Sequence, residues 1–552
     1  MSEVFTMRQL GSRLWFQTAC AILIAAPFFA VLLQLAYLPG LDETYQLEAA
    51  VNLASGRGYV ATREIAGDLS TPSFTYITGW PRGYSLLVAA VIAGGASFAI
   101  AAKLVKLVTI ALAMAAWLFL ARRLVVDLIS TLLFCGFISF FVVVCSESPT
   151  DLLILALFPL LLDLLLRLEA GHPIGKHWTH QDRFVCVLAG ALVGIAVALK
   201  YTAIPMVLVG MVWIAYANRA NRITLLRNLA FFMTPAALVI GPLFLANYLN
   251  ARSFSTVTDI SINGPLLGWH AKWIIESLTA FLVDAAYLPK IVIRELLAKL
   301  LPGQEAAMRT LAAGCLLVVL ILASVGLIRR GDPGRKLVAL TAVSYGSATL
   351  FLGAAASLFY YDSEWNPLQH GRYYQWAIPE VVLCLLLAAS PFFSRVLQGR
   401  GKAVAAALVA LPMAGFVGLN ALFAMHIFRT TDLINTDAQL AYQKIHSIWS
   451  AEESQALVVF ADSDNFRAAP WKGEVSIHFA SASFPPESYF SKKTVVAMLC
   501  SRSGSWELYS GNNACQSLGF DDAAAQFDFK KETVGVRNTL YWRVFSKGPS
   551  PK

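Results

Sequence analysis

Two adjacent carboxylates, Asp42 and Glu43, directly follow a long apolar run that ends in "LAYLPG". A carboxylate at the mouth of a membrane helix can accept the proton of a hydroxyl group during a group-transfer reaction. The same pair would also suit a solvated loop end beside a helix, and taken alone the two residues favour that interpretation. The rest of the sequence has to decide between a helix cap and a catalytic base.

Further carboxylates border another apolar run. Glu147 and Asp151, in "VVVCSESPTDLLIL", are four positions apart and can share one face of a helix. Both are costly to leave near lipid without a purpose. Ser-Pro-Thr-Asp is also a good signal for a helix N-terminus, which gives Asp151 a structural alternative.

Cationic residues occupy two comparable positions. Lys200 interrupts the apolar run of "ALVGIAVALKYTAIP", where its charge can hold a phosphate or simply extend to lipid headgroups. Arg372 and Tyr373 lie in "HGRYYQWAIPE", close to His370. An arginine can bind phosphate through two parallel hydrogen bonds, whereas the aromatic residues would also suit a membrane interface. Phosphate binding is therefore one of two interpretations at each position.

Composition indicates which elements must position these residues. Of the 552 residues, 57% are hydrophobic and only 14% are charged, a balance that a soluble protein of this size could not bury. The formal net charge is +9, but the Lys and Arg residues lie in short clusters between apolar runs, as in cytoplasmic loops of membrane proteins. The sequence therefore predicts a polytopic membrane protein without a nucleic-acid partner.

About eleven apolar runs are predicted to span the membrane, whose hydrocarbon layer is roughly 30 Å thick. They cover residues 16–38, 103–121, 124–145, 149–167, 184–200, 201–217, 229–248, 309–328, 337–357, 374–391 and 403–424. With a cytoplasmic N-terminus, every basic cluster falls on the cytoplasmic side, provided that the apolar segment 84–100 does not cross. This segment is short and contains Gly94-Gly95, so we expect a juxtamembrane or re-entrant helix on the outer face. The alternative is a miscount among the other spans.

The predicted fold class is an all-α polytopic membrane protein with a small α/β extracytoplasmic domain. Residues 1–424 form the transmembrane domain, with outer loops at 39–102 and 249–308. The second loop contains amphipathic stretches that are expected to lie in the interface plane. Residues 425–552 are polar and contain strand-like runs such as "ALVVFAD", "KTVVAMLC" and "TLYWRVFS".

Two cysteines of this polar segment, Cys500 and Cys515, are separated by the loop-like stretch "SRSGSWELYSGNNA". If the segment lies outside the cytoplasm we expect a disulfide between them, and otherwise two free thiols. The remaining cysteines lie in or beside apolar runs, where cysteine behaves as a small hydrophobic residue.

The motifs "LDETYQLEAAVNLASGRGYV" and "WPRGYSLLVAAV" resemble the first outer loop typical of bacterial GT-C glycosyltransferases. These membrane enzymes are related to protein O-mannosyltransferases and to the aminoarabinose transferase that modifies lipid A. In that family the acidic residue of the first loop lies where a lipid-linked sugar meets its acceptor. The usual pattern has prolines at the positions of Arg82 and Ser85, which leaves the conformation of this loop open.

The resemblance implies a role for each candidate residue. Asp42 is expected to be the catalytic base, with Glu43 as the alternative. Glu147 matches a carboxylate that binds a divalent metal, such as Mg²⁺ or Mn²⁺, or supports the first carboxylate, and Asp151 lies near it. The donor phosphate would be bound by Lys200, Arg372, Tyr373, His370 and Arg82. Neither a P-loop nor a Rossmann-type glycine motif is present, so no nucleotide cofactor is expected.

The predicted function is the transfer of a sugar from a polyprenyl phosphate, such as undecaprenyl phosphate, to a lipid, glycan or protein acceptor, with inversion. The predicted location is the outer face of the bacterial inner membrane. The alternatives are a transporter or flippase of lipid-linked sugars, and a polysaccharide polymerase or ligase. Transporters usually show internal repeats and polar helices near the bilayer midplane, whereas the ionisable residues here gather at one predicted face.

Overall fold

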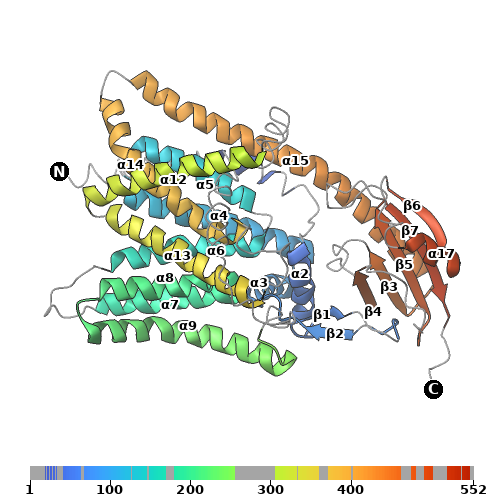
Figure 1. Ribbon diagram of the computed structural model, residues 1–552. Helices are drawn as coiled ribbons and strands as arrows, with labels where there is room; N and C mark the ends of the chain where they lie inside the picture. The colour runs from blue at the N-terminus through green and yellow to red at the C-terminus, as the bar shows by residue number, and fades with distance from the viewer. Residues whose placement is uncertain are drawn as a thin grey trace. The chain divides into compact units, whose positions relative to one another are not determined.

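The chain forms two compact units (Figure 1). The computed structural model describes residues 41–63, 68–71, 73–125, 127–145, 148–168, 180–254, 305–331, 334–359, 371–398, 402–461, 474–479, 490–501, 519–535 and 538–546, with isolated residues between 19 and 33. The helical unit contains Met1–Phe29, Thr78–Gly83 and Lys106–Leu422. The loop-and-sheet unit contains Ala30–Ile77, Tyr84–Val105 and Phe423–Lys552, so it combines much of the predicted first outer loop with the predicted C-terminal domain.

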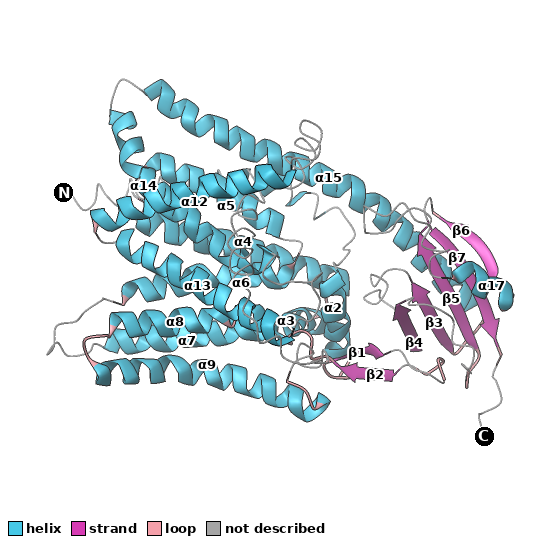
Figure 2. Cartoon of the chain, in the orientation of Figure 1, coloured by secondary structure: helices cyan, strands magenta, loops and turns pink. Residues whose placement is uncertain are grey.

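Helices occur at every predicted span from residue 103 onward (Figure 2). They are α4 (Phe98–Leu124), α5 (Leu128–Val144), α6 (Pro149–Arg167), α7 (His180–Leu199), α8 (Pro205–Ala217), α9 (Arg222–Ala251), α12 (Glu305–Arg330), α13 (Gly334–Phe359), α14 (Ile378–Gln398) and α15 (Lys402–Ala451). The last helix runs well beyond its predicted end at 424, because neither glycine nor proline interrupts the following sequence. The predicted span 16–38 and the second outer loop, 249–308, lie largely outside the described residues.

Five helices in the described part of the chain are long and apolar enough to cross a membrane. They are Phe98–Leu124, Pro149–Arg167, Asp182–Leu199, Arg222–Ala251 and Tyr373–Phe393. A helix rises 1.5 Å per residue, so about 20 residues match the hydrocarbon layer. The chain is therefore built as a multi-pass membrane protein, while the predicted total of about eleven spans stays a prediction.

The apolar segment 84–100 does not form a helix of membrane-spanning length. Its first part is α3 (Gly83–Ala93), which has 11 residues and would extend over only about 16 Å. A turn with Gly95 in the left-handed region, at φ +98°, follows it, and α4 begins at Phe98. This length agrees with the prediction that the segment does not cross the bilayer.

Small residues let the membrane helices α7 and α9 pack closely. A Cβ atom added to Gly190 of α7 would clash with the carbonyl oxygen of Phe232 in α9. The Phe232 ring is buried and also covers Gly210 of α8. Close backbone approach through glycine is the usual way in which membrane helices gain packing energy, because lipid already solvates their apolar side chains.

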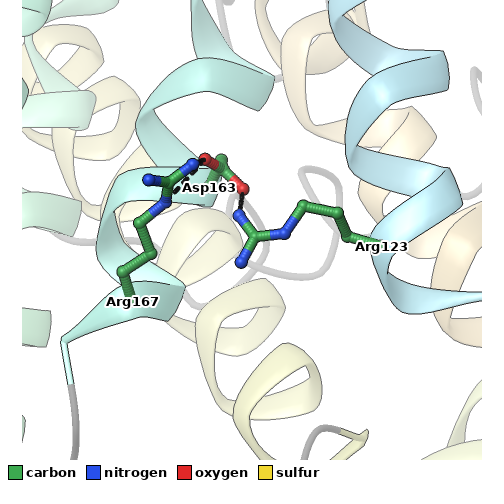
Figure 3. Close-up of polar contacts among 3 residues, drawn as sticks. All are labelled: Arg123, Asp163 and Arg167. Atoms are coloured by element: carbon green, nitrogen blue, oxygen red, sulfur yellow. Dashed lines mark hydrogen bonds and ion pairs between the residues drawn. The ribbon is translucent and has the colours of Figure 1, made fainter. Parts of the chain in front are cut away.

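A buried carboxylate joins α4 to α6 (Figure 3). Asp163 accepts hydrogen bonds from Arg123 of α4 through Oδ1 and from Arg167 of its own helix through Oδ2, the latter at 2.6 Å. The Asp163 side chain is 7% exposed, whereas the two arginine side chains are 44% and 41% exposed. Both arginines belong to the basic clusters that the sequence assigns to the cytoplasmic side, so this triad closes that end of the helix pair.

The C-terminal segment contains a five-stranded mixed sheet in the order β4-β3-β5-β7-β6. The strands are β3 (Ala456–Ala461), β4 (Glu474–Phe479), β5 (Thr494–Ser501), β6 (Lys530–Val534) and β7 (Asn538–Phe545). Strands β4, β3 and β5 are parallel, and β7 pairs antiparallel with both β5 and β6. The three strand-like runs noted in the sequence correspond to β3, β5 and β7.

Helices cover both faces of this sheet, because its strands alternate buried side chains between them. Leu457 and Val459 of β3 pack on one face against Ile445 and Ile448 of α15. Val458 packs on the other face in a second cluster with residues of α17 (Phe520–Gln526). Cys500 of β5 is disulfide-bonded, and its predicted partner, Cys515, lies outside the described residues.

The first loop folds into a helix and a hairpin within the same unit. The helix α2 (Leu41–Ala54) begins directly at the opening carboxylates. It is followed by β1 (Val60–Arg63) and β2 (Ser73–Tyr76), which pair antiparallel with Val60 opposite Tyr76. The carboxylate pair thus lies in the first turn of a helix, where negative charge is favoured.

Candidate active site

The buried carboxylate of the first loop is Glu43. Its side chain is only 2% exposed, and its Oε1 accepts a hydrogen bond of 2.5 Å from the hydroxyl of Tyr84. Tyr84 belongs to the Trp-Pro-Arg-Gly-Tyr motif and is fully buried. Glu43 is therefore no solvated loop residue, and the local interpretation of the pair as an exposed helix end is wrong for this member.

The Tyr84 hydroxyl stays protonated and can therefore donate to this carboxylate. Burial, then the charge of Glu43 and the hydrogen bond to it, raise the pKa of Tyr84 well above its ordinary value. The phenol therefore keeps its proton and fixes the orientation of the carboxylate. The next residue, Ser85, donates a hydrogen bond of 2.7 Å to the backbone oxygen of Gln46. The serine that replaces the usual proline thus also fastens α3 to α2.

Asp42 precedes Glu43 in the first turn of α2. Only its backbone belongs to the described part of the structure. Its assignment as the base stays a prediction, as does the choice between the two carboxylates.

Two polar residues that the sequence did not single out hold α2 against the hairpin. Oε1 of Glu48 accepts hydrogen bonds from the backbone nitrogen and the hydroxyl of Thr62, each at 2.6 Å. Asn52, one turn later, donates a hydrogen bond of 2.8 Å to the backbone oxygen of Val60. Glu48 and Asn52 are 8% and 3% exposed, so these contacts are sheltered from water. Their spacing of four residues on α2 is the only sequence signal that could have found them.

The second cluster lies in the helical unit and joins two residues that the sequence proposed. The Nζ of Lys200 lies 2.5 Å from Oδ1 of Asp151, and the two side chains are 10% and 7% exposed. The ammonium also lies 5.9 Å from the ring centroid of Tyr373. Lys200 is therefore buried in an ion pair and near an aromatic face, both of which stabilise its charge. It does not simply extend into the headgroup layer.

Helix ends and short turns position this cluster. Asp151 is in the first turn of α6, Lys200 immediately follows the last residue of α7, and Tyr373 belongs to the 3-10 helix η5 (Gly371–Ala377). Trp376 of η5 packs edge-on against Phe158 of α6, with ring centroids 4.6 Å apart. This ring contact packs η5 against α6, and it thereby keeps the Tyr373 ring near the Lys200 ammonium.

Asn247 closes α9 beside the same cluster. Its amide donates hydrogen bonds to the hydroxyl of Tyr201, at 2.7 Å, and to the backbone oxygen of Phe254, at 2.8 Å. Tyr201 follows Lys200 directly and opens the short helix η2 (Tyr201–Ala203). Asn247 therefore stabilises the short helix η2 that follows Lys200.

The Arg82–Gly83 dipeptide approaches the same end of α7. A Cβ atom added to Gly83 would lie 2.5 Å from the backbone oxygen of Ala198, two residues before Lys200. Only glycine permits this contact between the two backbones. Arg82 is half-buried next to it, so this candidate lies on the Lys200 side of the helical unit.

Several predicted residues cannot be compared with these contacts. Arg372 has its backbone in η5, but its side chain lies outside the described residues. Glu147 and His370 lie outside them altogether. Of the donor-phosphate candidates, the structure brings Lys200 and Tyr373 together.

Of the two carboxylates predicted to bind a metal, the structure describes the side chain of Asp151. No group of three or more His, Cys, Asp or Glu side chains suited to a metal ion occurs among the described residues. Oδ2 of Asp151 is buried and has no hydrogen-bond partner among the described residues, whereas Oδ1 contacts Lys200. An orphaned carboxylate oxygen is a fitting ligand for Mg²⁺ or Mn²⁺. Metal binding by Asp151 together with Glu147 stays a prediction.

Comparison with known proteins identifies the fold. No protein-family model matches the sequence, and no match is found among curated proteins. The structure of ArnT from Cupriavidus metallidurans bound to undecaprenyl phosphate is 14% identical, with a TM-score of 0.50 over 98% of this chain and 99% of that chain. The apo ArnT structure is also 14% identical, with a TM-score of 0.52 over 97% and 98%. At this identity the likeness shows a shared fold, which is the GT-C fold expected from the first-loop motifs.

An archaeal structure is less similar. The apo oligosaccharyltransferase of Archaeoglobus fulgidus is 14% identical, with a TM-score of 0.44 over 74% of this chain and 56% of that chain. This value is too low to add to the assignment of the fold.

Proposed function

We propose that this protein is an integral membrane glycosyltransferase that moves a sugar from a polyprenyl phosphate to a lipid, glycan or protein acceptor. The observation that carries the proposal is the buried ion pair of Lys200 with Asp151 beside Tyr373. A lysine that is paired with a carboxylate at the end of an apolar helix is suited to hold the phosphate of a lipid whose chain remains in the membrane. An ammonium has three N–H donors, so contact with Asp151 and with a phosphate are compatible.

The fold supports this substrate class. ArnT, an aminoarabinose transferase, has the same fold over nearly the whole chain, and one of its structures holds undecaprenyl phosphate. A fold alone does not fix an activity, which depends on the residues of the site. The donor is accordingly proposed as a class, and neither the sugar nor the acceptor is specified.

The proposed reaction is a single displacement. The acceptor hydroxyl oxygen attacks the anomeric carbon while the bond from that carbon to the phosphate oxygen breaks. The phosphate leaves with the electron pair, and the hydroxyl proton passes to a carboxylate of the first loop, Asp42 in the first instance and Glu43 as the alternative. Attack opposite to the leaving group inverts the anomeric configuration.

Electrostatic contacts to the leaving phosphate supply much of the rate enhancement in this scheme. Lys200 neutralises the growing charge, and Arg82, Arg372, His370 and Tyr373 are the further candidates for contacts to the phosphate. A divalent ion at Asp151 and Glu147 would add positive charge there when bound.

The orientation follows from charge. A cytoplasmic N-terminus places the basic clusters inside, and the same topology places Asp42, Lys200, Arg372 and the C-terminal sheet outside. We therefore assign transfer to the extracytoplasmic face of a bacterial inner membrane. A cysteine introduced at Ser55, an exposed residue of the first loop, should react with an impermeant thiol reagent in intact cells. Labelling only after lysis would overturn this orientation.

The activity is tested with purified protein in proteoliposomes and a radiolabelled polyprenyl-phosphate sugar. We expect label to move to an acceptor fraction together with release of polyprenyl phosphate, and NMR of the product should show the inverted anomer. Transmembrane movement of the labelled lipid without acceptor would support a flippase instead. Transfer of preassembled glycans but not of single sugars would support a polymerase or ligase.

A further inference from the structure

A three-residue segment of the first loop is fastened to the C-terminal domain. It consists of Asp68, Leu69 and Ser70 and is called the anchor segment. Oδ1 of Asp68 accepts a hydrogen bond of 3.1 Å from the backbone nitrogen of Ser491, and Oδ2 accepts one of 2.5 Å from the Ser491 hydroxyl. The Ser70 hydroxyl lies 3.0 Å from both the backbone nitrogen and the hydroxyl oxygen of Ser491. These partners are more than 400 residues apart in the chain, and both belong to the loop-and-sheet unit.

An apolar contact accompanies these hydrogen bonds. Leu69 is 3% exposed and belongs to the core cluster on one face of the sheet. Its neighbours in that cluster include Val458, Phe490 and Val496. A first-loop side chain therefore belongs to the core of the C-terminal domain, and its burial stabilises the contact.

The charge of the anchor carboxylate persists at all physiological pH values. Burial alone would raise the pKa of Asp68, but the hydrogen bonds from Ser491 and Ser70 outweigh it and lower the pKa to about 2. Both oxygens of the ionised Asp68 carboxylate therefore accept hydrogen bonds.

The anchor segment is connected to the buried Glu43 carboxylate through the hairpin and α2. It lies between β1 and β2, and the hairpin is fixed to α2 by the Glu48–Thr62 and Asn52–Val60 hydrogen bonds. Helix α2 carries Glu43 in its first turn, where Tyr84 holds it. The C-terminal sheet, the anchor segment, the hairpin and α2 all belong to one compact unit.

We propose that the C-terminal domain is a positioning support for the first loop, and that Asp68, Leu69 and Ser491 hold α2 in its working place. The residues touch neither donor nor acceptor, so they are positioning residues. The consequence for transfer rests on the proposed function, whereas the mechanical support of the hairpin does not. Misplacement of a catalytic group by about 1 Å can lower a rate about 100-fold, so a modest loss of support has a large effect.

Hydrogen exchange tests the support without reference to activity. Asp68→Ala should accelerate exchange of the backbone amides of residues 60–76 and of α2. Asp521→Ala is the matched control, because it removes a carboxylate of the same domain whose described hydrogen bonds come from Lys531 and Tyr541 and not from Ser70 or Ser491. Equal exchange in wild type and Asp68→Ala, or equal acceleration in both variants, would overturn the support.

A disulfide rescue tests the positioning role. With Ser70→Cys and Ser491→Cys, two sulfur atoms replace hydroxyl oxygens 3.0 Å apart, near enough for a disulfide after small adjustments. In the Asp68→Ala background we expect kcat to fall about 10- to 100-fold with the KM for the donor little changed, and oxidation of the cysteine pair to restore most of kcat. Wild type with and without oxidant controls for the native disulfide at Cys500.

The outcomes separate the two proposals. If wild type transfers no sugar, the proposed function fails, and the exchange experiment alone decides on the support. If wild type is active but Asp68→Ala keeps its kcat, the positioning role is wrong. A fall in kcat that the formed disulfide does not reverse would also overturn it, because fixing the anchor segment to the C-terminal domain would then not restore the rate.

Discussion

The hydroxyl of Tyr84 donates a hydrogen bond of 2.5 Å to the buried carboxylate of Glu43, across 41 positions of the sequence. This contact brings together the two motifs of the first loop, because Glu43 follows the first apolar run and Tyr84 ends the Trp-Pro-Arg-Gly-Tyr motif. It also explains how a carboxylate can be kept in a nearly water-free place. A buried charge needs hydrogen bonds, and Tyr84 provides one from a side chain that keeps its proton.

Removing that donor should reduce transfer. Tyr84→Phe leaves the buried Glu43 carboxylate without one of its hydrogen bonds. A hydrogen bond to a charged group contributes about 1.5–3 kcal/mol. If this free energy is lost from the transition state, the rate falls by a factor of roughly 10 to 100. Steady-state kinetics should show the loss mainly in kcat. Tyr216→Phe, on α8, is the control and should keep wild-type rates. Unchanged kinetics of Tyr84→Phe would show that this hydrogen bond has no part in transfer.

The contributions of the Lys200–Asp151 ion pair to stability and to transfer can be measured separately. Each single change, Lys200→Met or Asp151→Asn, removes one partner of a buried pair and should lower the free energy of unfolding by about 3–5 kcal/mol. The double variant should recover much of that stability, because no isolated charge remains. Transfer should stay low in the double variant, with a raised KM for the donor, if Lys200 binds phosphate. Recovery of both stability and transfer would make the pair purely structural.

The contact between Gly83 and Ala198 predicts a sharp difference between two glycine substitutions. Gly83→Ala places a Cβ atom 2.5 Å from the Ala198 backbone oxygen, which must displace one of the two backbones next to Lys200. Transfer should fall at least about tenfold, by the same sensitivity of rate to geometry. Gly241→Ala, in α9, meets nothing within 4 Å and should leave both transfer and thermal stability close to wild type. Equal effects of the two changes would contradict the close packing.

The Arg123–Asp163–Arg167 triad should matter for stability and not for transfer (Figure 3). Asp163→Asn removes the charge that the two arginines share and leaves them to repel each other. Because both arginines are partly exposed, water screens part of the loss, and we expect about 1–2 kcal/mol. The melting temperature in detergent should fall, and transfer at a permissive temperature should be unchanged. A specific loss of transfer in a protein of normal stability would place this end of the α4–α6 pair in the mechanism.

The sequence was sufficient for the elements that follow from local pattern. Long apolar runs predicted the helices from α4 to α15, and apolar runs between turns predicted β3, β5 and β7. The first-loop motifs indicated the GT-C fold that the ArnT structures share. In each case the signal is contained in a short window, because hydrophobic length and periodicity are local properties.

The partners of the candidate residues could not be predicted, because they depend on distant contacts. Nothing near Glu43 indicates that Tyr84 will donate to it, and nothing near Asp68 indicates that it will meet Ser491. Lys200 and Asp151 were each proposed from their place at an apolar boundary, but their direct pairing depends on how α6 and α7 pack. The anchor segment was missed altogether, since one Leu between two polar residues carries no recognisable pattern.

In the proposed reaction, a carboxylate of the first loop takes the acceptor proton during transfer from a polyprenyl phosphate. The most direct measurement is single-turnover transfer of radiolabelled sugar by wild type, Asp42→Asn and Glu43→Gln, with binding of the labelled donor measured in the same preparations. We predict that at least one variant loses about 100-fold or more in rate while it still binds donor, as expected for removal of a general base. Wild-type rates in both variants would contradict the claim.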